Sequence, residues 1–117
     1  MNVLAHVQKY MIESDTFYEG FISSSWFNIY HKEFFQEYHM HLDPISRYIC
    51  GIVYFTDSRS ITQFHMHNSI TVKPEVAKIV IFPDNIEHRV NAHNDEEERI
   101  TLAFNYRKCN IWKGMNI

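Results

Sequence analysis

The sequence predicts an all-β domain, on the evidence of two apolar runs and one alternating segment. The segments 47–56 (RYICGIVYFT) and 77–82 (AKIVIF) are nearly continuous apolar runs, which is typical of strands buried on both faces. The segment 99–107 (RITLAFNYR) instead alternates between two kinds of side chain, with the two-residue period of a strand. Helices do not alternate with these strands, so the pattern favours a sandwich, a jelly roll or a small barrel over an α/β fold.

A short helix and further strands complete the predicted order. Apolar residues recur at helical spacing near the N-terminus, so residues 2–13 predict an amphipathic helix. Aromatic and β-branched residues predict the remaining strands, and polar breaks around two of them favour a hairpin. These strands are 25–30, 60–66, 69–73 and 88–93, and the hairpin pairs 60–66 with 69–73. The chain then has about seven strands with short connections.

The composition describes a single domain spanning residues 1–117. A chain of 117 residues with 45% hydrophobic content can bury one core. The formal net charge of −3 gives no sign of general nucleic-acid binding, and no apolar run approaches the roughly 20 residues of a membrane span. The N-terminus lacks a signal-peptide pattern, and Cys50 and Cys109 lack metal-type spacing. We therefore expect a cytoplasmic protein with reduced thiols.

Histidine is unusually frequent, with eight in the chain. In the stretch HMHLD an extended backbone would project His39, His41 and Asp43 to one side. His88 follows a buried strand and is a natural remote partner. Two close ligands and one remote ligand form the facial triad of non-heme iron, which leaves coordination positions open. The alternative is that these histidines are ordinary surface residues.

The segment 99–107 separates small or polar residues from apolar ones. One face consists of Arg99, Thr101, Ala103 and Asn105, and the other of Ile100, Leu102, Phe104 and Tyr106. The apolar face is ordinary core packing. The polar face either meets solvent or lines the interior of a barrel, where the guanidinium of Arg99 would hold an anion.

Six motifs in order give the sequence a family resemblance. They are WFN (26–28), HMH (39–41), CGIVYF (50–55), AKIVIFP (77–83), HRV (88–90) and RITLAFN (99–105). In this order the chain resembles the small 2-oxoglutarate/Fe(II)-dependent dioxygenases, and most of all a bacterial and phage-type branch of them. The resemblance implies a double-stranded β-helix, which is a cupin-like jelly roll, here with a short N-terminal helix. It also implies Fe(II), 2-oxoglutarate and O₂ as cofactor and cosubstrates.

The resemblance assigns roles to particular residues. His88 matches the distal iron ligand, and Arg99 matches the arginine that pairs with the distal carboxylate of 2-oxoglutarate. Thr101 takes the place of a supporting serine, and Tyr54 matches a tyrosine that holds the same carboxylate. The near ligands stay open. The spacing from Trp26 favours the pair His39 and His41, whereas the wider superfamily pattern favours His41 and Asp43. His65 and His67 fall outside the ligand positions.

Several alternatives also stay open. The motifs HMH and FPDNIEHRVN are similar to cupin motifs, which would give a metalloprotein without 2-oxoglutarate, and a non-catalytic jelly-roll module for binding or assembly is a third reading. Ala77 replaces a family glycine and the stretch 56–76 is short, which would also suit a degenerate member. The prime substrate of an oxygenase and the oligomeric state, a homodimer among the options, are not fixed. If the gene is carried by a phage, the compartment is the host cytoplasm.

Overall fold

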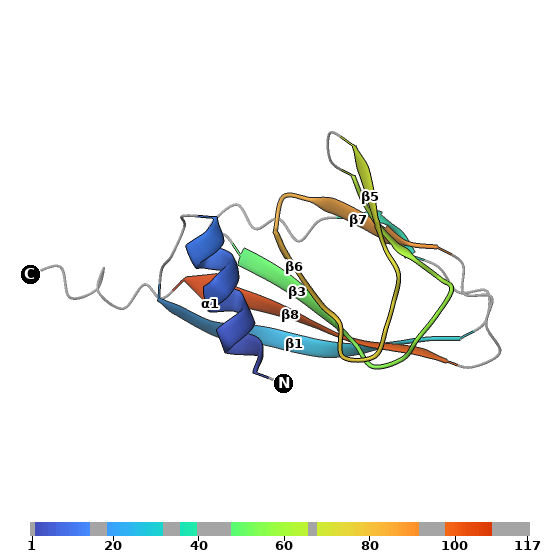
Figure 1. Cartoon of the computed structure of the whole chain (residues 1–117), viewed down its shortest axis with the longest axis horizontal. Helices are drawn as coiled ribbons and strands as arrows, with labels where there is room; N and C mark the ends of the chain where they lie inside the picture. The colour runs from blue at the N-terminus through green and yellow to red at the C-terminus, as the bar shows by residue number, and fades with distance from the viewer. Residues whose placement is uncertain are drawn as a thin grey trace, which may run out of the picture.

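The computed structural model describes residues 2–14, 19–31, 36–39, 48–65, 68–91 and 98–108. These residues form one α-helix and two four-stranded antiparallel sheets (Figure 1). The elements are α1 (Val3–Glu13), β1 (Gly20–Tyr30), β2 (Gln36–His39), β3 (Tyr48–Tyr54), β4 (Thr62–His65), β5 (Ser69–Val72), β6 (Ile79–Pro83), β7 (Glu87–Val90) and β8 (Arg99–Lys108).

The strand order is that of a jelly roll. One sheet has the order β1-β8-β3-β6 and the other has the order β2-β7-β4-β5. The chain therefore crosses between the sheets at most of its connections, and every recorded strand pair is antiparallel. This arrangement confirms the predicted all-β, cupin-like fold with a short N-terminal helix.

Helix α1 covers part of the outer face of the first sheet, at one end of its strands (Figure 1). The side chain of Asn2 caps the helix, because its Oδ1 accepts a hydrogen bond of 3.0 Å from the backbone N–H of Ala5. Val7 and Met11 are fully buried against the sheet. Their cluster consists of Val7, Met11, Ile49, Val53, Phe104 and Tyr106. This outer core uses the apolar face of β8, as the sequence predicts.

A second core lies between the two sheets. It consists of Cys50, Ile52, Tyr54, Phe64 and Phe82. Strand β3 contributes alternate residues to both cores, which confirms the prediction of a strand buried on both faces. Gly51 of this strand lies opposite Phe104, and a Cβ atom there would come within 2.0 Å of the Phe104 ring. The glycine is therefore needed for the ring to pack.

The structure departs from the predicted elements in three places. Strand β2 was not predicted from the sequence, because its sequence QEYH is short and has no apolar alternation. Strand β1 begins five residues earlier than predicted, at Gly20. Strand β6 is half-buried rather than buried on both faces, because it lies at the edge of its sheet and pairs only with β3 among the described strands.

One residue has a backbone conformation that favours glycine. Ala77 has φ = 68°, in the left-handed region that side chains with a Cβ atom rarely adopt. Its backbone N–H donates to the carbonyl of Tyr54 at 2.9 Å, which fixes the turn before β6. As for membranes, the helix found in the described part of the chain is too short and too polar to cross one.

Candidate active site

The polar face of β8 lies inside the jelly roll. Arg99, Thr101 and Ala103 are 1%, 2% and 6% exposed, so this part of the face lines the interior, whereas Asn105 at its far end is only half-buried. The antiparallel register places Tyr30, Asn28 and Trp26 of β1 opposite these three residues in the same order. Alternate residues of a strand share a face, so two adjacent strands together build one wall of the site.

Arg99 is the largest fully buried side chain of the described residues. Its Nη2 donates to Thr62 Oγ1 at 2.8 Å. Its guanidinium carbon lies 5.0 Å from the ring centre of Tyr30 and 5.6 Å from that of Tyr54, within the range of cation–π attraction. No carboxylate of the described residues pairs with it, and its Nε has no hydrogen-bond partner there. The site therefore holds a buried cation with one unused donor.

Burial also shifts the ionisation of these groups. Desolvation lowers the pKa of Arg99, and the neighbouring Tyr54 and Tyr30 oppose that shift. Desolvation raises the pKa of Tyr54, while its bond to Thr62 and the nearby Arg99 cation act in the other direction. The Tyr54 hydroxyl is 2.8 Å from Thr62 Oγ1 and stays protonated at neutral pH, so it can still donate a hydrogen bond.

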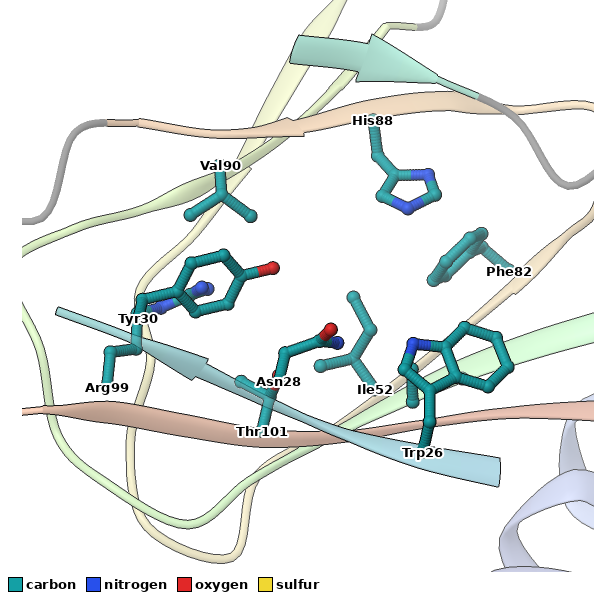
Figure 2. Close-up of a pocket in the computed structure, with 11 residues that line it drawn as sticks. Trp26, Asn28, Tyr30, Ile52, Phe82, His88, Val90, Arg99 and Thr101 are labelled. Atoms are coloured by element: carbon teal, nitrogen blue, oxygen red, sulfur yellow. The ribbon is translucent and has the colours of Figure 1, made fainter. Parts of the chain in front are cut away.

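His88 faces this wall from the other sheet. It is 4% exposed and its ring packs against Phe82 and Phe64, at 4.9 and 5.8 Å between ring centres. Figure 2 shows His88 and Val90 pointing from β7 across the cavity toward the residues of β1. The Nδ1 of His88 is 3.4 Å from the carbonyl oxygen of Ile86. A carbonyl can only accept, so this contact favours the tautomer that carries its proton on Nδ1.

The cavity between the two walls has a volume of about 130 Å³. A cavity of about this size accepts a molecule of several non-hydrogen atoms. Its lining is polar near Arg99 and apolar near Phe82 (Figure 2). The lining residues are Trp26, Asn28, Tyr30, Gly51, Ile52, Phe82, His88, Val90, Arg99, Thr101 and Ala103.

The predicted near ligands fall in a part of the chain that is described only to its backbone or not at all. The backbone register of β2 and β7 places His39 opposite His88. His41 and Asp43 lie outside the described residues. In the described ranges no three His, Cys, Asp or Glu residues cluster as metal ligands. The metal site thus stays a prediction, with His39 and His88 brought to adjacent strand positions.

The second HMH motif lies elsewhere. His65 ends β4 and is exposed, whereas its neighbour Phe64 faces inward opposite His88. His67 lies outside the described residues. The prediction that neither histidine is a metal ligand is consistent with the position of His65 and is otherwise untested.

Sequence reasoning missed three kinds of site residue. Trp26 and Asn28 were noted only as part of the WFN motif. Tyr30 was not noted, although it lies two residues after Asn28 on β1 and alternate positions of one strand share a face. Thr62 had no local signal, because its role depends on Arg99, 37 residues further along the chain.

Part of the chain resembles a known protein family. Residues 51–105 match the model of a family described as "Putative 2OG-Fe(II) oxygenase". The matched segment contains Tyr54, His88, Arg99 and Thr101, and the family's cofactors are Fe(II) and 2-oxoglutarate. No curated protein matches the sequence.

Solved structures of similar fold include three oxygenases. A 2OG-Fe(II) oxygenase-family oxidoreductase from Burkholderia pseudomallei has a TM-score of 0.73 at 17% identity, covering 86% of this chain and 51% of that chain. A prolyl-4-hydroxylase from Pseudomonas putida has a TM-score of 0.65 at 17% identity, covering 73% and 52%. A prolyl 4-hydroxylase from Phytophthora capsici has a TM-score of 0.62 at 18% identity, covering 93% and 40%.

The similarity of fold and the family-model match both point to the 2OG-Fe(II) oxygenases. The chain has the jelly-roll fold of these structures, and the predicted resemblance to the 2-oxoglutarate/Fe(II) oxygenases is confirmed. The chain spans about half the length of these three solved structures, or less.

Proposed function

We propose that this chain is an Fe(II)- and 2-oxoglutarate-dependent oxygenase domain that hydroxylates an organic substrate. The observation that carries the proposal is the buried guanidinium of Arg99, with its unpartnered Nε, in a cavity that His88 enters from the opposite sheet. An isolated buried charge destabilises a fold by several kcal/mol unless it is compensated. The site therefore favours an anionic ligand.

The chemistry of the Arg99 pocket fits a carboxylate. A guanidinium offers a planar pair of donors that matches the two oxygens of a carboxylate. Thr101 lines the cavity with Arg99 and can add a neutral donor, whereas Tyr54 lies on the same inner face outside the cavity lining and bonds to Thr62. A cupin without 2-oxoglutarate would give no reason to bury this cation, so Arg99 favours the oxygenase over that alternative.

The donor set of the opposite wall fits iron. A buried histidine whose Nδ1 lies near a carbonyl is a typical metal ligand. Residues opposite one another in an antiparallel pair occupy the same face of the sheet, so the register of His39 with His88 supports His39 as a second ligand. His41 would be the third. The competing set replaces His39 with Asp43.

The chain's own residues would orient the cosubstrate and keep the cavity dry. Bound Fe(II), with 2-oxoglutarate and O₂, would supply the oxidising chemistry that hydroxylates a C–H bond of the substrate. Arg99 would hold the far carboxylate of 2-oxoglutarate. Ile52, Phe82 and Val90 line the cavity with apolar surface that excludes water.

An anaerobic titration tests the proposed function. Purified protein is mixed with Fe(II), and 2-oxoglutarate is added while the visible spectrum is recorded. We expect a weak charge-transfer band that saturates at one equivalent of 2-oxoglutarate. A protein that binds neither Fe(II) nor 2-oxoglutarate would contradict the proposal, and Fe(II) binding without 2-oxoglutarate binding would favour the cupin alternative.

Two substitutions distinguish the candidate ligand sets. His39→Ala should weaken Fe(II) binding severely if His39 is a ligand, while Asp43→Ala should then have a small effect. Calorimetric titration with Fe(II) under anaerobic conditions measures both variants. The reverse order would exclude His39 and assign Asp43.

A further inference from the structure

Thr62 of β4 has an unexpected position for a polar residue. It is fully buried, and on the inner face of the second sheet its register neighbours are Val72 on one side and Val90 on the other. Valine has nearly the same shape as threonine, so a third valine would continue this row. Packing alone therefore does not account for the hydroxyl of Thr62.

The hydroxyl joins two groups that come from the opposite sheet. Thr62 Oγ1 is 2.8 Å from Arg99 Nη2 and 2.8 Å from the Tyr54 hydroxyl. A guanidinium can only donate, so Thr62 accepts the bond from Arg99. The hydroxyl still has its own proton, which it can give to Tyr54. Tyr54 is fully buried and is not among the residues that line the cavity, so this bond fixes the position of Thr62.

We infer that Thr62 is a positioning residue, which is itself anchored by Tyr54 and holds Arg99 in the geometry that binds the carboxylate of the ligand. This inference rests on the proposed function, because it concerns the same anion site. Linked hydrogen bonds polarise one another, so the charge of Arg99 makes Thr62 a stronger donor to Tyr54. The Arg99 Nε, which has no partner in the described residues, is left for the ligand.

The principal test is Thr62→Val, which removes the hydroxyl and keeps the shape. We expect the affinity for 2-oxoglutarate in the presence of Fe(II) to fall roughly 10- to 100-fold, the effect of losing a hydrogen bond to a charged group. Fe(II) affinity should stay unchanged, because Thr62 is not placed among the ligands. Thr62→Ser should retain wild-type affinity. Thr71→Val, an exposed threonine on β5, is the matched control and should change nothing.

A second measurement separates positioning from a merely structural role. The Nε–H proton of Arg99 can be followed by ¹⁵N nuclear magnetic resonance in the protein without ligand. We expect its exchange with water to accelerate in Thr62→Val and to stay slow in Thr62→Ser. If Thr62→Val does not fold, Thr62→Cys, which is close in size and only a weak acceptor, takes its place in both measurements.

The outcomes distinguish this inference from the proposed function. Equal 2-oxoglutarate affinities for wild type and Thr62→Val would overturn the role of Thr62 and leave the proposed function standing. A wild-type chain that does not bind 2-oxoglutarate would overturn the proposed function. In that case the exchange rate of the Arg99 Nε–H proton with water would test the inference. An unchanged exchange rate in Thr62→Val would overturn it.

Discussion

The two faces of strand β8 lie in different environments. On the outer face, Phe104 and Tyr106 pack against helix α1 in an apolar cluster. On the inner face, Arg99 and Thr101 are equally buried but line a cavity with an unused hydrogen-bond donor. Equally buried side chains on the two faces of β8 therefore have different roles. The outer face is filled by apolar packing within the chain, whereas on the inner face the Nε of Arg99 has no hydrogen-bond partner among the described residues.

The largest expected effect is on metal binding at the inner wall. His88→Ala should abolish stoichiometric Fe(II) binding, because it removes the buried remote ligand of the proposed site. Anaerobic equilibrium dialysis measures the bound iron. The double variant His65→Ala and His67→Ala is the control and should retain the metal. If His88→Ala still binds one equivalent, the proposed metal site is wrong.

A substitution on the outer face should act on stability instead. Phe104→Ala should lower the free energy of unfolding by about 3–5 kcal/mol, because it leaves a cavity beneath α1. Chemical denaturation measures the loss. Leu102→Ala, at a half-buried position of the same face, should cost less. Equal losses of unfolding free energy for the two variants would contradict the deeper burial of Phe104 beneath helix α1.

The inner-face counterpart is Arg99→Ala. Loss of a buried charge-assisted contact costs on the order of 2–5 kcal/mol, so 2-oxoglutarate affinity should fall roughly 30-fold to several-thousand-fold. Fe(II) binding should be retained. Arg99→Lys should rescue only in part, because an ammonium cannot make the planar two-point contact. Anaerobic calorimetry measures these affinities, and wild-type affinity in the Ala variant would remove the basis of the oxygenase proposal.

The smallest effect concerns the turn before β6. Ala77→Gly should raise the free energy of unfolding by about 0.5–1 kcal/mol, because glycine adopts the positive φ of this position without strain but gains freedom in the unfolded chain. Ala5→Gly in helix α1 is the control with the opposite sign and should cost about 0.5–1 kcal/mol. Thermal denaturation compares the two, and destabilisation by Ala77→Gly would contradict the conformation of the turn.

The sequence predicted those parts of the molecule that depend on local patterns. The alternation of β8 identified both of its faces, and the apolar run of β3 identified a strand buried on both sides. Strand β2 had no such pattern, because four residues of mixed polarity are stabilised by pairing with β7 and not by their own propensity. Thr62 was missed for a related reason, since the partners of its hydroxyl belong to the opposite sheet.

The burial of the Cys50 thiol bears on the proposed oxygenase activity. Cys50 lies in the core between the sheets, beside the strand residues that line the cavity, and burial raises its pKa to about 12. Oxidants attack the thiolate form of cysteine far more readily than the thiol. At neutral pH this residue is almost entirely thiol. A reaction that releases oxidants in the neighbouring cavity would therefore oxidise Cys50 more slowly than an ordinary thiol, and one route of self-inactivation would be slower.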